Sequence, residues 1–371
     1  MSALPAQADV RVEPPFRYTV KPGDTLSGLA ANYLVGGDYV QIQKLNKIAD
    51  PYRLPIGSLL LIPDHLLRIV PVVGKVSSFR GSVTIDGRQA ALGDEVRQGM
   101  RVETGASASV TIGMPDGSAI SLPSQSRVFV ARLRRVLLTG GVERDFRLEA
   151  GRARSTVTPI KDPGSDFRVT TPLSVAAVRG TDFRVALDDS GDRALTEVVG
   201  GTVGVASGQE TDEVAVPKGF GAVSTPSGTE PPIPLLPAPK LLQIERTENG
   251  VAITGELVEG AARYRIQLAT DIAFLDVIDE AIVDKPSVTF VLPLNATFFV
   301  RLTAIAASGM EGLPGTYAPG QRLGAIDPDA AGDRAASLPL RPAATPRSLR
   351  FSMTGHGRVA AQSIVLHPTL R

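Results

Sequence analysis

Residues 104–122 read TGASASVTIGMPDGSAISL, and two short runs in this stretch alternate apolar residues with small or polar ones. The runs are VTI at 110–112 and ISL at 120–122, and the tripeptide PDG at 115–117 lies between them. A period of two indicates a half-buried β-strand, and a Pro-Asp-Gly segment is typical of the turn that joins two strands. The stretch therefore predicts a β-hairpin.

The same pattern extends over residues 69–224. Further apolar pairs, separated by Gly-containing turns, are Val83/Ile85, Val128/Val130, Val203/Val205 and Val214/Val216. A weak echo also recurs as GSVTI at 81–85, GRARS at 151–155 and GTVGV at 201–205, each with a glycine before small or β-branched residues at every second place. Repeated short strands of this kind predict an all-β domain with a solenoid-like or barrel-like stack.

Three stretches of this region resemble the FecR family domain: TGASASVTIGMPDGSAISL, FRVTTPLSVAAVRGTDFRV at 167–185 and VPKGFGAV at 216–223. The resemblance implies a periplasmic β domain. The best-known members of that family are sensors that control an anti-sigma system, and they also carry a cytoplasmic helical region and a membrane span. Because neither feature is seen in this sequence, we carry over only the β domain.

Arginines are concentrated in one part of the FecR-like domain, with a local excess of five positive charges. They are Arg127, Arg132, Arg134, Arg135, Arg144, Arg147, Arg152 and Arg154, against Glu143, Asp145 and Glu149. We favour the interpretation that they line solvated strand faces; the alternative is a surface for an anionic partner, such as peptidoglycan peptide carboxylates or lipid phosphates. We expect Arg179 to pair with Asp182 or Asp166 and not with a ligand.

A different pattern occupies residues 17–66. The run YTV at 18–20 predicts a short strand, and Asp24 or Thr25 can cap the helix that follows, whose buried face contains Leu26, Leu29, Ala30 and Tyr33. A second helical pattern covers residues 39–46, and the apolar run LLLI at 59–62 ends at a proline. The predicted order is strand, helix, helix, strand.

This segment resembles the LysM family in YTVKPGDTLSGLA at 18–30, in Leu45-Asn46 and in PIGSLLLIP at 55–63. The resemblance implies a βααβ module that binds N-acetylglucosamine-containing glycans, such as peptidoglycan or chitin, in a groove between two loops. Carried over to this chain, the groove residues are Gly23, Asp24, Thr25 and Leu26 on one side, and Ile48, Ala49, Asp50 and Pro51 on the other.

An acetamido sugar is uncharged, so its recognition needs backbone N–H and C=O groups and an apolar wall. Gly23 allows close approach of the backbone, and we expect Leu26 and Ile48 to supply the wall. Ser27 stands where family members often carry an aromatic residue. We therefore expect a modest affinity, with a Kd in the millimolar to micromolar range, or about 4–8 kcal/mol.

The C-terminal part begins with a proline-rich segment, TPSGTEPPIPLLPAP at 225–239, which predicts a semi-extended linker. Alternating runs over 240–323 predict a β-sandwich. ARYRIQLATDIAF at 262–274 and FFVRLTAIAASGMEG at 298–312 resemble fibronectin type III modules, although the core tryptophan is missing and Phe298 replaces the corner tyrosine. Residues 324–371 read as a flexible tail with one short strand at 363–366.

Composition excludes several classes of function. The chain has no cysteine, a net charge of +1, and only His65, His356 and His367 as histidines, without the spacing of metal ligands. We therefore expect no thiol nucleophile, metal, cofactor or catalytic residue and no nucleic-acid partner. No GxSxG motif occurs, and a glycosidase that uses only carboxylates would need a cleft domain for which the three modules leave no room. No stretch reads as a transmembrane helix.

The 371 residues suggest two or three domains. Residues 1–16 read as a flexible leader in which Ala6-Gln7-Ala8 is similar to the end of a cleaved secretory signal. We expect a non-enzymatic, exported, periplasmic protein that binds peptidoglycan or a related polymer through its LysM module and offers the β domains to a protein partner in the envelope. The alternative is a periplasmic sensor or assembly scaffold whose essential binding is between proteins.

Overall fold

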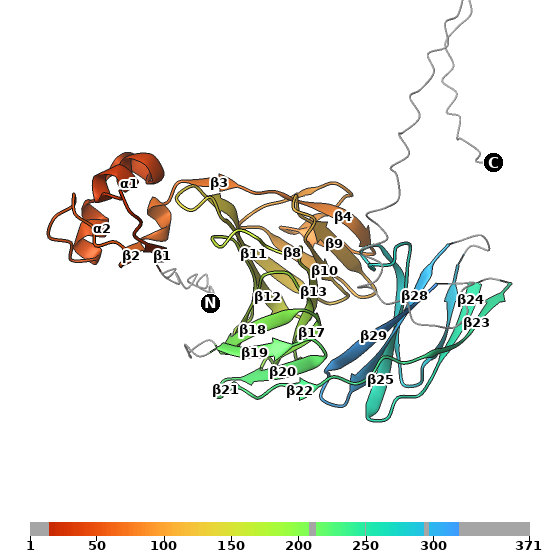
Figure 1. The fold of residues 1–371 in the computed structure, drawn as a ribbon. Coiled ribbons are helices and arrows are strands. Elements are labelled where there is room, and N and C mark those ends of the chain that lie inside the picture. Colours follow the sequence, from red (N-terminus) through yellow and green to blue (C-terminus); the bar gives the residue numbers. More distant parts are fainter. Residues whose placement is uncertain (1–14, 208–212, 249, 293–296, 319–371) are drawn as a thin grey trace, which may run out of the picture. The chain divides into compact units, whose positions relative to one another are not determined.

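The computed structural model describes residues 15–207, 213–248, 250–292 and 297–318. The described chain is mainly β, which confirms the predicted fold class, and its α-helices lie in the first fifty residues (Figure 1). Among the helices that the structure describes, none is long and apolar enough to cross a membrane. Residues 1–14 of the predicted leader and the whole of the predicted tail, with its short strand at 363–366, His356 and His367, fall outside the described residues. Phe16, the last residue of the predicted leader, already belongs to a strand.

The N-terminal module has the predicted order of elements. They are β1 (Phe16–Thr19), α1 (Leu26–Tyr33), the 3-10 helix η1 (Val35–Gly37), α2 (Val40–Leu45) and β2 (Leu59–Ile62). β1 and β2 pair antiparallel, with Tyr18 opposite Leu60. The side chain of Thr25 accepts a hydrogen bond from Gly28 N–H at 3.1 Å, so Thr25 is the N-cap of α1. A second 3-10 helix, η2 (Asp64–Leu66), follows.

The FecR-like region contains two ten-stranded sheets. The first sheet contains β4 (Gly74–Arg80), β7 (Glu95–Val96), β9 (Ser109–Gly113), β10 (Ala119–Leu122), β13 (Arg152–Thr156), β16 (Asp182–Leu187), β17 (Ala194–Gly200), β20 (Phe220–Thr225), β21 (Gly228–Thr229) and β22 (Ile233–Pro234). The second sheet contains β3 (Ile69–Pro71), β5 (Val83–Ile85), β6 (Arg88–Gln89), β8 (Arg101–Thr104), β11 (Arg127–Val136), β12 (Val142–Ala150), β14 (Asp166–Thr170), β15 (Ser174–Val178), β18 (Thr202–Ser207) and β19 (Glu213–Pro217).

The two sheets enclose one apolar core between them. Phe183 of the first sheet meets Phe167 of the second with ring centroids 6.4 Å apart, and both side chains are fully buried. The predicted hairpin is present as β9 and β10, with Ile112 opposite Ile120. The side chains alternate between this core and the outer faces, which is why the sequence shows a period of two.

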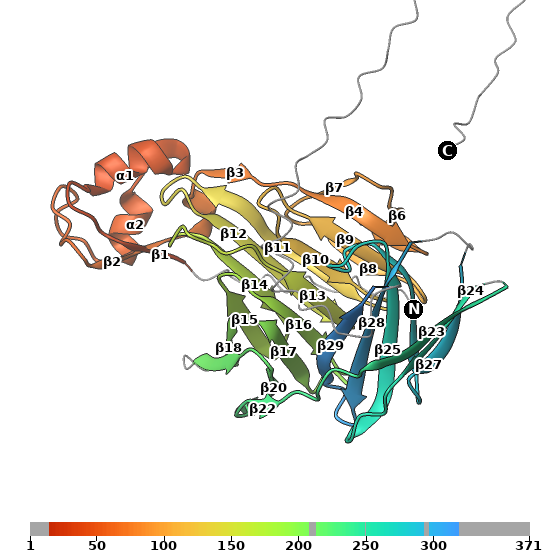
Figure 2. The same ribbon diagram turned by 45° about the vertical axis from the view of Figure 1, so that its right-hand side comes forward.

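The chain passes repeatedly from one sheet to the other as it moves along them (Figure 2). This path agrees with the solenoid-like expectation, whereas the barrel-like one is wrong, because neither sheet closes on itself among the described strands. The glycines that open the sequence echo, Gly81, Gly151 and Gly201, have φ of +69°, +72° and +79°. Each lies at the turn before a strand, where only glycine adopts this conformation without strain.

The predicted linker is partly absorbed into the FecR-like region. β21 and β22 both pair with β20, through Ser224 opposite Thr229 and Gly221 opposite Ile233. The expectation of a free semi-extended spacer from residue 225 is therefore wrong for its first ten residues. A turn at residues 226–228 reverses the chain, so that Gly228 pairs with Thr225 of β20. Pro234 lies at the end of a two-residue edge strand, where its missing N–H is tolerated.

A seven-stranded sandwich follows. Its three-stranded sheet contains β23 (Leu241–Thr247), β24 (Gly250–Gly255) and β27 (Ser287–Val291), and its four-stranded sheet contains β26 (Val277–Val283), β25 (Ala261–Ala269), β28 (Phe299–Ala306) and β29 (Glu311–Tyr317). The core between these sheets is apolar and includes Ile253, Ile266, Phe290 and Val300. The predicted β-sandwich is thus present.

The outer face of the four-stranded sheet packs on the first FecR-like sheet through charged side chains. Glu197 and Glu311 are 0% and 3% exposed at the side chain, and three arginines surround them. We call these five residues the Arg–Glu cluster: Arg152, Arg184, Arg265, Glu197 and Glu311. The shortest ion pairs are Arg152 to Glu197 at 2.9 Å, Arg184 to Glu197 at 2.8 Å and Arg265 to Glu311 at 2.8 Å.

Burial alone would raise the pKa of Glu311, but Arg152, Arg265 and Arg184 hold it well below its usual range. The Glu311 N–H also donates to Glu197 Oε1 at 2.8 Å, so the backbone of the sandwich is tied to a buried carboxylate of the FecR-like region. One ion pair and one hydrogen bond join β4 to the sandwich at the rim of this contact. The ion pair is Arg80 to Asp279 at 2.6 Å, and the hydrogen bond is from the Ser78 hydroxyl to Asp276 at 2.9 Å.

The turn between β11 and β12 reaches the N-terminal module. Val136 and Leu138 are buried in the same apolar cluster as Leu29 and Leu34 of that module. Beside them Arg134, 4% exposed at the side chain, pairs with Glu143 at 2.7 Å and with Asp64. The N-terminal module therefore shares part of its core with the FecR-like region.

Candidate glycan-binding site

The structure brings the two predicted loops into direct contact. The loop between β1 and α1 meets the loop between α2 and β2 where Leu26 N–H donates to the Pro51 carbonyl oxygen at 2.9 Å. This bond uses the first free N–H of a helix, which lacks a partner within the helix itself. The bond places Leu26, the last predicted site residue of the first loop, next to Pro51, the last of the second.

The first loop is held by the Asp24 carboxylate. Its Oδ2 accepts hydrogen bonds from Lys21 N–H at 2.7 Å and from the Tyr18 hydroxyl at 2.8 Å. Burial and the bond to Asp24 raise the pKa of Tyr18 to about 12. Gly23, at the tip of this turn, is exposed with φ of +88°, a conformation that an L side chain rarely adopts. Asp24 therefore shapes the loop, and Gly23 presents its backbone.

The expectation that Leu26 forms an apolar wall for the sugar is wrong. Its side chain is 0% exposed, because it is the first residue of α1 and points into the module's core. Ile48 is half-buried and packs against the same core, and Gln43 fixes it by donating from Nε2 to its carbonyl oxygen at 3.1 Å. Only part of the Ile48 side chain is left to contact a ligand.

The second loop exposes Ala49 and Asp50. Asp50 Oδ1 accepts a hydrogen bond from Tyr52 N–H at 2.9 Å, and the Asp50 carbonyl oxygen accepts one from Arg53 N–H at 3.2 Å. The carboxylate also lies 4.0 Å from Arg53 Nε, and both side chains are more than half exposed. The loop is thus a compact turn with little net charge.

Sequence reasoning missed two exposed apolar side chains in the loop between α2 and β2. Tyr52 is 67% exposed and follows Pro51 directly, and Ile56, farther along the loop, is 68% exposed. Exposed aromatic side chains combine a flat apolar face with a polar tip, which suits the apolar face and hydroxyl rim of a sugar ring. The signal available was the aromatic residue after Pro51, one position beyond the predicted site.

Backbone donors complete the surface. Within the residues that the structure describes, the N–H groups of Gly23 and Ala49 have no protein acceptor. The described part of the chain also contains no group of His, Cys, Asp or Glu that could hold a metal ion. Two exposed backbone donors, an aromatic face and a balanced charge form a surface suited to a neutral polar ligand.

The concentration of arginines in the FecR-like domain does not form one surface. Arg134 and Arg144 are buried, so the expectation of solvated faces is wrong for them. Most of the other six have carboxylate partners: Arg127 with Glu103, Arg132 with Asp64 and Glu143, Arg152 with Glu197 and Arg154 with Asp182. The buried Arg144 pairs with Asp116. The expectation that Arg179 pairs with Asp182 or Asp166 is wrong, because Arg154 and Arg168 pair with those two carboxylates. Arg179 donates instead to the Pro163 carbonyl oxygen at 2.8 Å.

Comparison with known proteins supports two of the three modules. Residues 18–63 match the family model of the LysM domain, and residues 100–204 match that of the FecR protein. Neither family is enzymatic, and both are typical of proteins of the cell envelope. The curated proteins gave no match.

Two crystal structures of a candidate anti-sigma factor from Parabacteroides distasonis, at 1.65 and 2.50 Å resolution, are similar to part of the chain. Their sequence identities are 17% and 18%, and each alignment has a TM-score of 0.29 and covers 36% of this chain and 57% of that one. The chain thus spans little more than half the length of these solved structures. On the family matches, the chain contains a LysM domain at residues 18–63 and a FecR domain at residues 100–204.

Proposed function

We propose that this chain is a non-enzymatic, periplasmic protein that binds the N-acetylglucosamine glycan of peptidoglycan through its LysM domain. The observation that carries the proposal is the contact between the two loops, where Leu26 N–H bonds to the Pro51 oxygen beside exposed Gly23 and Tyr52. A LysM domain points to glycans as the ligand class, and this surface presents what such a ligand needs.

The sugar would lie across the surface formed by Gly23, Ala49, Asp50 and Tyr52. The exposed N–H groups of Gly23 and Ala49 would donate to the acetamide oxygen, and the Tyr52 ring would cover an apolar face of the sugar. Asp24, Thr25, Leu26 and Pro51 would act by holding these loops, because their polar groups or side chains are already occupied within the module.

The FecR domain and the sandwich act as interaction modules in this proposal. The sandwich has a three-stranded and a four-stranded sheet in the order expected of a fibronectin type III-like module, which supports that kinship. A sensor or assembly scaffold is the second candidate, and the FecR match favours it. In that case the essential contact is with an envelope protein, and deleting residues 240–323 abolishes function whereas deleting residues 17–63 does not.

Co-sedimentation of the full chain with insoluble peptidoglycan, with chitin and cellulose alongside, tests the glycan proposal. We expect binding to peptidoglycan, and we expect Tyr52→Ala to bind about tenfold more weakly, a loss of about 1.4 kcal/mol from the missing aromatic contact. Leu257→Ala is the matched control, because Leu257 is 70% exposed on the sandwich, and it should bind as the wild type does.

Two results would contradict the proposal. If the intact chain does not sediment with peptidoglycan, the LysM domain is not a peptidoglycan-binding module in this protein. If Tyr52→Ala and Leu257→Ala bind equally well, the glycan site lies away from these two loops. Circular dichroism of each variant establishes that the comparison is made between folded proteins.

A further inference from the structure

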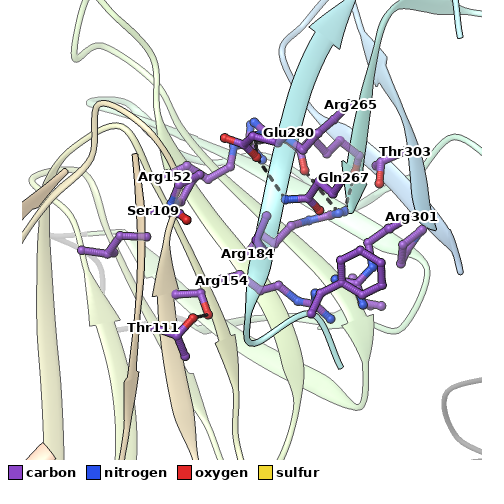
Figure 3. A pocket seen from close by; sticks show the side chains of 18 of the residues that line it. Ser109, Thr111, Arg152, Arg154, Arg184, Arg265, Gln267, Glu280, Arg301 and Thr303 are labelled. Atoms are coloured by element: carbon purple, nitrogen blue, oxygen red, sulfur yellow. Dashed lines mark hydrogen bonds and ion pairs between the residues drawn. The ribbon is translucent and has the colours of Figure 1, made fainter. Parts of the chain in front are cut away.

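A cavity lies between the FecR region and the sandwich, beside the Arg–Glu cluster (Figure 3). β9, β10 and β13 form one wall, and β25 and β28 form the other. Its volume of about 60 Å³ leaves room for a small ion or a few water molecules. Five arginines line it: Arg152, Arg154, Arg184, Arg265 and Arg301.

Four of these arginines have carboxylate partners. Arg152, Arg184 and Arg265 belong to the Arg–Glu cluster, and Arg265 also pairs with Glu280 at 2.8 Å. Arg154 makes a two-point contact with Asp182, with Nε to Oδ1 at 3.0 Å and Nη2 to Oδ2 at 2.6 Å. The five guanidinium groups thus have four carboxylates as ion-pair partners, Glu197, Glu280, Glu311 and Asp182, and the Asp271 carboxylate acts on Arg154 from farther away. One positive charge is left without an ion-pair partner.

That charge belongs to Arg301 of β28. The residue is 5% exposed, and among the described residues no carboxylate lies within ion-pair distance of it. Its hydrogen bonds are long: Nε to Thr316 Oγ1 at 3.5 Å and Nη2 to the Ala273 oxygen at 3.4 Å. The guanidinium lies 3.9 Å from the Phe274 ring centroid. A ring face offsets part of the cost of removing a cation from water, but less than an anion does.

A second cation converges on the same acceptor. Arg154 Nη1 lies 3.5 Å from the Ala273 oxygen, the atom that Arg301 Nη2 also approaches. Two guanidinium groups, one from each domain, thus share a single neutral carbonyl oxygen at long distance. An oxygen with a full negative charge would make shorter and stronger bonds to both.

Hydroxyl groups stand on the opposite wall. Ser109, Thr111 and Ser121 line the cavity from β9 and β10, and Thr111 Oγ1 lies 2.8 Å from Ser121 Oγ. Thr303 lines it from the sandwich. Hydroxyl donors together with guanidinium groups are the donor set that proteins use for phosphate, sulfate and carboxylate oxygens.

We propose that this cavity is a binding site for a small oxyanion, with Arg301 as its ionic partner, Arg154 as a second donor and the hydroxyl groups as additional donors. The cavity volume fits inorganic phosphate, sulfate or a single carboxylate group. An anion bound there receives hydrogen bonds from the FecR domain and the sandwich at once, so it also strengthens the contact between them. This site is separate from the glycan surface of the LysM domain.

Thermal unfolding of the full chain, titrated with sodium phosphate, sodium sulfate or sodium acetate, tests the proposal. The ionic strength is held constant with sodium chloride. Because an anion that binds only the folded state stabilises it, we expect the Tm to rise with the concentration of at least one oxyanion. The three salts distinguish a tetrahedral anion from a carboxylate. In Arg301→Gln the apparent Kd for that oxyanion should be at least tenfold weaker.

Arg263→Gln is the matched control, because Arg263 is exposed on β25 of the same sheet and should leave the apparent Kd unchanged. Arg301→Lys keeps the charge and serves if the Gln variant does not fold; it should retain weakened binding. If phosphate or sulfate raises the Tm, a crystal grown in sodium selenate should show anomalous density beside Arg301, and its absence there would overturn the proposal. Equal Tm shifts for the oxyanions and chloride, or equal Kd values for Arg301→Gln and wild type, would also overturn it.

Discussion

At the residue scale, the bond between Tyr18 and Asp24 shows how a core residue holds the loop between β1 and α1. Burial and this hydrogen bond raise the pKa of Tyr18 to about 12. The stabilisation that the neutral Tyr18 gives the folded state is therefore complete below pH 10.0, the usual pKa of a tyrosine, and is lost as the pH rises through about 12. We expect Tyr18→Phe to cost about 1 kcal/mol at neutral pH and to make the unfolding free energy fall less steeply between pH 10 and 12. Urea unfolding at both pH values measures this; parallel curves for wild type and variant would contradict it.

At the element scale, the turn between β11 and β12 belongs to the FecR region in sequence but to the LysM domain in packing. Leu138 is 7% exposed in the LysM core, whereas its neighbour Leu137 is 40% exposed. Leu138→Ala should therefore destabilise the module by about 2 kcal/mol, the lower end for a buried leucine, and speed hydrogen exchange of α1 amides. Leu137→Ala removes the same atoms from an exposed side chain, so it should change neither the stability of the module nor the exchange of the α1 amides. Equal exchange rates in the two variants would show that the turn is not part of that core.

At the scale of the whole molecule, the Arg–Glu cluster couples the FecR region to the sandwich. Glu197→Gln leaves three buried guanidinium groups with Glu311 as the one carboxylate of the cluster, and it should cost about 3–5 kcal/mol, splitting one calorimetric transition of the two domains into two. Asp279→Asn breaks the rim pair with Arg80, whose side chain is 40% exposed, and should cost less than about 1 kcal/mol and keep one transition. Two separate transitions in the wild type would show that the cluster does not couple the domains.

Local patterns in the sequence predicted the elements well, because strands, caps and turns depend on near neighbours. The β9–β10 hairpin and the order of the LysM elements followed from alternation and from Thr25 as a cap. Leu26 was assigned both to the buried face of its helix and to the sugar-binding wall, and the structure favours the first assignment. Helical spacing was the better guide, since it reports which face of a helix packs inward.

Contacts between distant segments could not be predicted in this way. Arg184 and Glu311 are 127 residues apart, and no spacing rule relates them. The arginine count suggested solvated faces or an anionic partner, whereas most of these side chains have carboxylates from other strands. Arg301 could not be identified as a candidate anion ligand from the sequence. Its proposed role depends on its burial without a carboxylate at ion-pair distance, which only the packing of the described residues shows.

The charged contact between the FecR region and the sandwich has a consequence for biosynthesis. The sandwich follows the FecR region along the chain, so the FecR face with Arg152, Arg184 and Glu197 is in water until residues 261–317 have folded. An apolar face exposed to solvent for that time would bind other nascent chains or chaperones. A face of guanidinium and carboxylate groups stays hydrated instead, and water leaves only when the matching sheet arrives.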